Sequence, residues 1–433
     1  MRNPSPALQS SRVITRSPVY YGWVILIVGT LGVIMSSPGQ TYSFSIFIEE
    51  FIRDLGLTRT SVSGLYTVGT ITGSLMLPYI GRLIDKHGSR RMVVLIALAF
   101  GLACVYMSTV STFLMLGIGF VFMRMLGQSS ITIVSRNVMN QWWVRRRGFV
   151  LSISTLVAAT LGSGTFPGLI NWLIPQFGWR TTYVILGVAV MVIMIPIGYF
   201  FFRDRPELFG LFPDGLKSQE EAEALDKVSK AEVVLVDAEN WTAQEAMKTR
   251  TFWIIAMSIA ASSMLGTGLT FHIVSIFQES GLSDNLAAAI FFPMALTTAI
   301  MSIPFGWLID RIEAKYLVVA GLSILTIVII FSGYISSPTV AIIYGVVFGL
   351  GNAFDRVVSN VIWANYFGRP NLGAISGATM TIGAAASGLG PLVYGVGFDL
   401  SGSYRPSLWL STLYPLIMIV LVLSVRRPTK KKE

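Results

Sequence analysis

The sequence predicts an all-α membrane protein in which twelve transmembrane helices form two similar six-helix bundles. Of its 433 residues, 53% are hydrophobic and only 12% are charged, whereas a soluble domain carries about 25% charged residues. The mean hydropathy is +0.67. One strongly polar segment, residues 203–250, divides the apolar residues into two halves. This composition excludes an ordinary soluble enzyme, a disordered protein and a secreted disulfide scaffold.

The apolar residues fall into blocks that are separated by short segments rich in charged and turn-forming residues. About 20 apolar residues cross the hydrocarbon core as a helix, which also satisfies every backbone polar group. We expect twelve such helices, at approximately 21–48, 60–80, 92–110, 113–142, 148–173, 181–202, 252–279, 285–309, 315–335, 339–366, 372–398 and 405–425. The resulting domains are a tail (1–20), a first bundle (21–202), a linker (203–250), a second bundle (251–425) and a basic tail (426–433).

The basic residues predict the orientation of these helices. With the N-terminus in the cytoplasm, 25 of the 32 Lys and Arg residues lie on the cytoplasmic side and four lie on the other side. Positive loops stay in the cytoplasm, so we expect a multi-pass protein of a bacterial plasma (inner) membrane with both termini cytoplasmic. This distribution explains the net charge of +10 without a nucleic-acid partner.

The few cysteines and histidines limit the chemistry of the chain. The single cysteine, Cys104, excludes an internal disulfide, and the two histidines make a His-rich metal centre improbable. No nucleotide-binding loop or catalytic cluster is evident. We therefore expect no enzyme activity, no cofactor and no metal, and a monomeric protein in the lipid bilayer.

The two halves carry a faint internal repeat. GRLID at 81–85 returns as GWLID at 306–310, and VSRNVMNQWW at 134–143 parallels VSNVIWANYF at 358–367. Duplicated bundles are a common plan of transporters, which place the substrate site between the halves near the membrane midplane. Within the linker, we expect short helices at 219–232 and at 241–250, the second with Thr242 as its N-cap.

GRLIDKHGSRR at 81–91 resembles the signature of the major facilitator superfamily between its second and third helices. Arg124, followed by Gly127-Gln128, resembles the arginine motif of the fourth helix in that family. The resemblance covers nearly the whole chain and implies the major facilitator fold. It also implies a gating role, in which Asp85 lies near a helix N-terminus and pairs with a neighbouring helix when the cytoplasmic side is shut. The residues that match the motif or its second copy are Gly81, Asp85, Gly88, Arg90, Arg91, Asp310 and Arg311.

Within the superfamily, the chain resembles the monocarboxylate porters and their oxalate:formate antiporter relatives. The similar segments are YYGW at 20–23, SFSIFIEEF at 43–51, WWVRRRG at 142–148, RDRPELFGLFPDG at 203–215 and NYFGRPNLGAISG at 365–377. The resemblance implies a small organic anion such as a monocarboxylate as substrate. The family's basic residues are not carried over, because Thr41 or Tyr42, Thr298 and Ser302 stand at the places of its helix-1 and helix-8 charges.

Charged side chains inside the spans are the strongest site candidates, because a charge in hydrocarbon is unfavourable without water or a partner. Asp355 and Arg356 lie near the middle of the tenth span. We expect Arg356 to hold the substrate carboxylate and Asp355 to take up a coupling proton. The alternative is a static salt-bridge network. Arg124 is a second candidate contact, whereas we expect Arg136 to reach the cytoplasmic interface.

Polar and aromatic residues of the spans complete the expected site. His272, toward the outer end of the seventh span, is a candidate for proton entry, with a packing histidine as the alternative. The candidate pocket residues are Gln40, Tyr42, Tyr66, Asn137 and Asn352.

The leading hypothesis is therefore a proton-coupled transporter of a small monocarboxylate that works by alternating access. The alternatives are a proton-independent anion exchanger, an exporter of larger hydrophobic compounds and a sensor that binds without transport.

Overall fold

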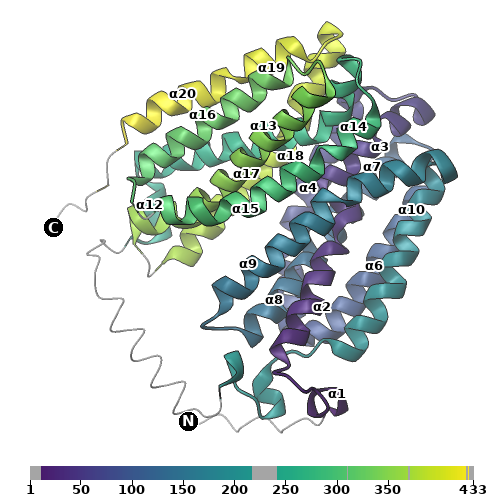
Figure 1. Cartoon of the computed structure of the whole chain (residues 1–433), viewed down its shortest axis with the longest axis vertical. Coiled ribbons are helices and arrows are strands. Elements are labelled where there is room, and N and C mark those ends of the chain that lie inside the picture. The colour runs from purple at the N-terminus through teal and green to yellow at the C-terminus, as the bar shows by residue number, and fades with distance from the viewer. Residues whose placement is uncertain (1–10, 217–240, 310, 369–370, 426–427, 429–433) are drawn as a thin grey trace.

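The computed structural model of the chain describes residues 11–216, 241–309, 311–368, 371–425 and 428. Ten helical segments of this part are long and apolar enough to cross a membrane. One of them, Arg147–Phe201, has 55 residues, which is enough for two crossings at about 20 residues each. The helical pair α4 and α5 adds a further, more polar crossing. Twelve transmembrane helices in two six-helix bundles are therefore present, and Figure 1 shows the bundles side by side.

The first bundle contains six crossings, four of which are interrupted. The first crossing consists of α2 (Gly22–Ile34), η1 (Ser37–Gly39) and α3 (Thr41–Leu55), the second of α4 (Arg59–Leu75) and α5 (Leu77–His87), and the third of α6 (Ser89–Ser108). The fourth consists of α7 (Phe113–Phe122), η2 (Met123–Ile131) and α8 (Thr132–Trp142). The fifth and sixth consist of α9 (Arg147–Ala158), η3 (Ala159–Gly164) and α10 (Phe166–Phe201). A short helix, α1 (Arg12–Thr15), precedes them.

The second bundle is more regular. Its helices are α13 (Arg250–Glu279), α14 (Asp284–Ala289) and α15 (Phe291–Ile309), α16 (Ala314–Ser332), α17 (Pro338–Phe367), α18 (Leu372–Ser401), α19 (Arg405–Ser411) and α20 (Leu413–Leu423). The part of the chain that connects the two bundles contains η4 (Pro206–Phe209), η5 (Pro213–Gly215) and α12 (Ala243–Met247). We call the membrane side that carries η4, η5 and α12 the linker face, and the opposite side the far face.

The first crossing is broken, where the sequence predicted a continuous helix. Pro38 and Gly39 form the short turn η1. A Cβ atom on Gly39 would stand 2.5 Å from the backbone oxygen of Met123, so only glycine permits this approach of the first crossing to the fourth. The break lets Gln40 and Tyr42 begin a new helix at half depth.

The fifth and sixth crossings join without the loop that the sequence predicted at 174–180. The residues on either side are helical, and α10 consists of two helices that are separated at Gly178, whose φ is 75°. A positive φ is available to glycine without strain. One residue therefore reverses the chain direction at the far face.

The two bundles meet through α4 against α18, α3 against α13, and α15 against η3. Within the second bundle, α13 and α18 approach so closely that a Cβ on Gly390 would lie 1.8 Å from the oxygen of Met264. Small residues allow such helix contacts in membranes. The Gly-rich stretch at 383–391 thus lies in the contact surface of α18.

The expected linker helix near residue 241 is confirmed. Thr242 caps α12, and Glu245 completes a capping box with the Thr242 backbone. The helix expected at 219–232 and residue Asp310 lie outside the described residues.

Replacement of Gly390 by alanine tests the helix contact. We expect Gly390→Ala to destabilise the protein by about 1–3 kcal/mol, because α13 and α18 must separate to admit the methyl group. Thermal unfolding of the purified full chain in detergent measures the effect. Gly377→Ala in the same helix is the matched control, since no atom lies within 4 Å of its Cβ position. Equal melting temperatures for the two variants would refute the close contact.

Candidate functional site

A cavity of about 800 Å³ lies between the two bundles. Both halves contribute its walls, through the first, fourth and fifth crossings on one side and the seventh, eighth and tenth on the other. Its polar lining residues are Ser36, Gln40, Tyr42, Thr132, Arg136, Ser154, Thr155, Ser163, Thr270, Thr298, Asn352, Asp355, Arg356 and Ser359. Arg136, Asp355 and Arg356 are the charged residues among them.

Helical spacing explains how α17 reaches this cavity. Asn352, Asp355, Arg356 and Ser359 stand at positions i, i+3, i+4 and i+7, which share one face of a helix, and all four line the cavity. The sequence left open whether Asp355 and Arg356 point to the same place. The structure brings both to the cavity, and Asp355 also borders a small space of about 10 Å³ beside Ser258 and Ser262 of α13.

Arg136 lies in the cavity wall and not at the membrane interface, where the sequence placed it. Thr132, Arg136 and Met139 occupy positions i, i+4 and i+7 of α8 and all three line the cavity. Arg136 therefore lies where its face of the helix points, and the prediction of an interfacial position, which used only its depth in the membrane, was wrong. The sequence did contain a signal for this position. In the internal repeat, Thr132 corresponds to Arg356 at an offset of 224 residues, and Arg136 follows Thr132 by one helical turn.

The two cavity arginines come from opposite halves and carry no partner. Both are exposed to the cavity, and within the described residues no hydrogen bond or ion pair reaches either guanidinium group. Arg136 and Arg356 also repel each other electrostatically. Two cations in one cavity, neither held by a hydrogen bond or ion pair among the described residues, form a place where an anion would be stabilised.

Other predicted pocket residues divide into two groups. Gln40, Tyr42 and Asn352 line the cavity, where the Tyr42 hydroxyl lies 2.9 Å from the Ser37 hydroxyl. Tyr66 and Asn137 are not among the lining residues. Asn137 follows Arg136 directly and therefore points about 100° away from it on the helix.

Arg124 is sealed inside the first bundle. Its side chain is 1% exposed, its Nε donates to the Thr70 hydroxyl at 2.9 Å, and its guanidinium lies 4.6 Å from the Tyr66 ring centre. The structure thus gives Arg124 packing contacts with the second crossing, and it does not bring this residue to the cavity.

Comparisons with known proteins identify the family. The profile of the major facilitator superfamily matches residues 29–297 and 251–433. The chain belongs to the major facilitator superfamily. It is accordingly a multi-pass membrane transporter, as the sequence predicted.

Individual members of the superfamily are distant. The chain is 21% identical to the 4-hydroxybenzoate transporter PcaK of Acinetobacter baylyi, over 78% of this chain and 77% of that one. It is 25% identical to the probable nitrate/nitrite transporter NarK2 of Mycobacterium tuberculosis, over 81% and 82%. It is 24% identical to the glucose transporter GlcP of Staphylococcus epidermidis, over 93% of each.

A solved transporter structure has the same fold. The inward-facing, unoccupied crystal structure of a bacterial homologue of the human lysosomal transporter Spinster aligns with a TM-score of 0.65. The alignment covers 93% of this chain and 95% of that one, at 15% identity.

The far face of the transporter is closed by contacts between the halves. Six hydrogen-bonded pairs join the two bundles toward this face: Arg59–Tyr404, Thr60–Asp399, Ser63–His272, Thr67–Gly388, Asn171–Asn285 and Glu49–Ser275. At the linker face, Figure 1 shows the bundles diverging. The structure therefore represents a state that is closed at the far face.

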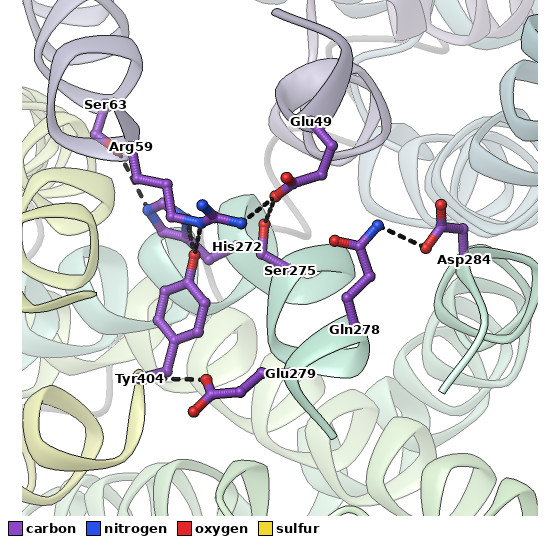
Figure 2. Close-up of polar contacts among 9 residues, drawn as sticks. All are labelled: Glu49, Arg59, Ser63, His272, Ser275, Gln278, Glu279, Asp284 and Tyr404. Atoms are coloured by element: carbon purple, nitrogen blue, oxygen red, sulfur yellow. Dashed lines mark hydrogen bonds and ion pairs between the residues drawn. The ribbon is translucent and has the colours of Figure 1, made fainter. Parts of the chain in front are cut away.

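His272 belongs to this closure. It is fully buried, its Nε2 lies 2.9 Å from the oxygen of Pro391, and its Nδ1 lies 3.0 Å from the Tyr404 hydroxyl. Figure 2 shows it with Glu49, Arg59, Ser275 and Tyr404. We call these five residues the far-face cluster.

The signature loop between the second and third crossings contacts its own bundle. Arg90 donates from Nε to the oxygen of Tyr199 at 2.9 Å. The sequence placed Asp85 near a helix N-terminus, but it lies exposed in the last turn of α5. Asp204 takes that position: its carboxylate accepts the backbone N–H groups of Ser89 and Arg90 at the start of α6. Asp204 follows the sixth crossing, so only tertiary structure brings it there.

A second aspartate of the linker holds the loop between the fourth and fifth crossings. The Asp214 carboxylate accepts the backbone N–H groups of Arg145 at 2.7 Å and Arg146 at 3.0 Å, beside the start of α9. Tyr20 adds a hydrogen bond from its hydroxyl to the oxygen of Trp142 at 2.9 Å. Burial raises the pKa of Tyr20, so this hydroxyl keeps its proton.

Removal of the charge at Arg124 and at Arg136 should change the stability of the protein to different extents. We expect Arg124→Met to lower the free energy of unfolding by about 2 kcal/mol, because hydrogen bonds from a charged donor are lost in a buried place. Arg136→Met is the matched control and should not destabilise, since it removes no bond. Thermal unfolding of both variants measures this. A larger loss for Arg136→Met would contradict the assignment of the two environments.

Proposed function

We propose that the protein is a secondary active transporter of a small organic anion, with a monocarboxylate as the leading substrate class, and that it works by alternating access with proton coupling. The site is the central cavity. Arg356 and Arg136 are its anion-binding residues, and Gln40, Tyr42 and Asn352 supply neutral hydrogen-bonding groups.

The observation that carries this proposal is the pair of unpartnered guanidinium groups from opposite halves. The described cavity lining contains two arginines and one aspartate, so its formal charge is positive. A guanidinium group binds a carboxylate bidentately. An anion between Arg136 and Arg356 would relieve their mutual repulsion and would contact both bundles at once.

Relatives support the anion as substrate. PcaK is named for 4-hydroxybenzoate, a carboxylate, and NarK2 for nitrate and nitrite. The resemblance of 20–23, 43–51 and 203–215 to monocarboxylate porters supports the same class. GlcP is named for glucose, so the charged cavity, and not the relatives alone, favours an anion here.

Asp355 is the proposed proton carrier. It lies beside Arg356 on the same helix face and lines the same cavity. Within the described residues, no ion pair fixes its carboxylate. A carboxylate that water can reach, next to the anion site, can exchange a proton when the anion binds or leaves.

Proton-independent anion exchange is the second candidate. When the cavity is empty, Arg136 and Arg356 repel each other. If only an anion relieves that repulsion, the empty carrier cannot close around its cavity, and each return step needs a counter-anion. A proton on Asp355 is not needed in this scheme.

The orientation in the membrane follows from the basic residues. We propose that the linker face is cytoplasmic, in a plasma membrane, because Lys and Arg are concentrated there. For the loop at 81–91, we propose that Asp85, with Arg90 and Arg91, closes this face in the opposite state. Asp85 is exposed in the present state and is free to form such a contact.

Loss of Arg356 tests the anion site. We expect Arg356→Ala to weaken carboxylate binding by about 2–5 kcal/mol, because a bidentate charged contact is lost, and to abolish uptake into proteoliposomes. A thermal-shift screen of purified protein against small mono- and dicarboxylates first supplies the substrate. Arg53→Ala is the control, since Arg53 is exposed at the far face, away from the cavity, where it pairs with Glu50.

Unchanged uptake by Arg356→Ala would remove the site assignment. Ligand binding without any flux in the wild-type protein would instead indicate a sensor. Stabilisation only by large apolar compounds would favour the exporter.

Loss of the Asp355 carboxylate tests proton coupling. We expect Asp355→Asn to lose proton-driven accumulation of the anion while exchange against an internal anion continues, because the amide cannot take up a proton. Uptake driven by an imposed pH gradient, compared with counterflow in the same vesicles, measures both activities. Accumulation at the wild-type level would show that the proton binds elsewhere, and wild-type uptake that ignores the pH gradient would favour the exchanger.

A further inference from the structure

Glu49 joins the two halves at the far face. It lies on α3, and its Oε1 accepts a hydrogen bond from Nη2 of Arg59 on α4 at 2.8 Å. The same oxygen accepts the hydroxyl of Ser275, which belongs to α13 of the second bundle. Figure 2 shows this shared oxygen between Arg59 and Ser275.

Arg59 extends the contact from Glu49 into the second bundle. Its Nε donates to the Tyr404 hydroxyl at 3.0 Å, and its guanidinium carbon lies 4.2 Å from the ring centre of Phe398. The Tyr404 hydroxyl in turn contacts His272. The charge on Glu49 therefore orients the arginine that crosses the interface.

Glu49 is also accessible to water. Its side chain is 24% exposed and that of Arg59 is 18% exposed, although the far face is closed at the depth of His272. In this closed state the Glu49 carboxylate is thus partly exposed, and it lies six residues before the far-face end of α3.

Protonation of Glu49 would weaken the far-face cluster in two ways. It would remove the ion pair with Arg59, and it would make the hydrogen bond from the Ser275 hydroxyl a neutral one, which is about half as strong. We propose that Glu49 is a proton-binding site of the far face, and that a proton on Glu49 releases the contact between the halves and favours opening toward that side. This inference rests on the proposed function, in which external protons drive uptake.

Other titratable groups near Glu49 have different partners. On α3 itself, Glu50 pairs with Arg53, and Asp54 binds Arg180 within the first bundle. On α13, Glu279 accepts the backbone N–H of Tyr404 at 2.9 Å within the second bundle.

Three further titratable groups lie near Glu49. Asp284 of α14 accepts from Gln278 in its own bundle, and His272 is engaged through both ring nitrogens. Asp399 of α18 accepts the backbone N–H of Thr60 at 2.8 Å. Among the described carboxylates, Glu49 and Asp399 are thus the two that join the halves, and Glu49 alone does so while paired with an arginine.

The test measures opening of the far face in the full chain, without substrate. Ser111 and Ser336 are exposed residues of far-face loops in opposite bundles, and the natural Cys104 is fully buried. Spin labels on Ser111→Cys and Ser336→Cys report the distance between the bundles by double electron–electron resonance. Samples in lipid nanodiscs are compared from about pH 8 to about pH 4, a range that includes the ordinary pKa of glutamate.

We expect the population with the longer distance to rise as the pH falls in the wild-type background. Glu49→Gln should show the long distance at every pH, with an open-to-closed ratio roughly tenfold or more above that of the wild type at high pH, because a hydrogen bond to a charged group is lost. Glu50→Gln is the matched control on the adjacent residue and should keep the pH response. Asp399→Asn should also keep it.

A wild-type distance that does not change with pH, or a Glu49→Gln variant that stays closed, would overturn the proposal. Ser275→Ala supplies a second test that preserves the Glu49–Arg59 pair: it should raise the open population but retain a pH response. If uptake assays show no anion transport while the distance still responds to pH through Glu49, the proposed function fails and the proton site stands. If uptake depends on Arg356 but the distance ignores pH, only the proton site fails.

Discussion

An ionised side chain within a membrane needs either a set of hydrogen-bond partners or water, and this constraint organises the interior of the transporter. Arg124 satisfies it with Thr70 and the ring of Tyr66 inside one bundle. Arg136 and Arg356 instead face a cavity between the bundles. The same residue type within the membrane therefore serves structure in the first case and is available to a ligand in the second.

The contacts between the bundles determine which side of the transporter is closed in this structure. The hydrogen bonds that join the halves lie toward the far face, and the cavity lies beyond them. Where α18 packs against α4 of the other bundle, glycines such as Gly395 permit backbone approach, since a Cβ there would stand 3.0 Å from the backbone oxygen of Arg59, and this provides packing without directional bonds. Packing of this kind allows two bundles to rock, whereas the charged contacts at Glu49 and Arg59 favour one of the two states.

Helix N-termini at the linker face are fixed by carboxylates from distant parts of the chain. Asp204 accepts the first N–H groups of α6, and Asp214 accepts N–H groups beside the start of α9. Carboxylates are stabilised at such termini, where backbone N–H groups are unpaired and the helix dipole is positive. The segment after the sixth crossing thus ties two loops of the first bundle together, so that this bundle can move as one body.

The sequence by itself determined the class of the protein, because the crossings follow from length and hydropathy, and the two halves follow from the polar linker and from the GRLID and GWLID repeat. It also determined the depth of Asp355 and Arg356, since depth is a count of residues along a helix. Only the tertiary structure decided which side chains face the cavity, because the rotation of a helix depends on its neighbours: Arg136 turns to the cavity and Arg124 away from it. The contacts of Asp204 and Glu49 were likewise beyond the sequence, since each joins crossings that are far apart in the chain.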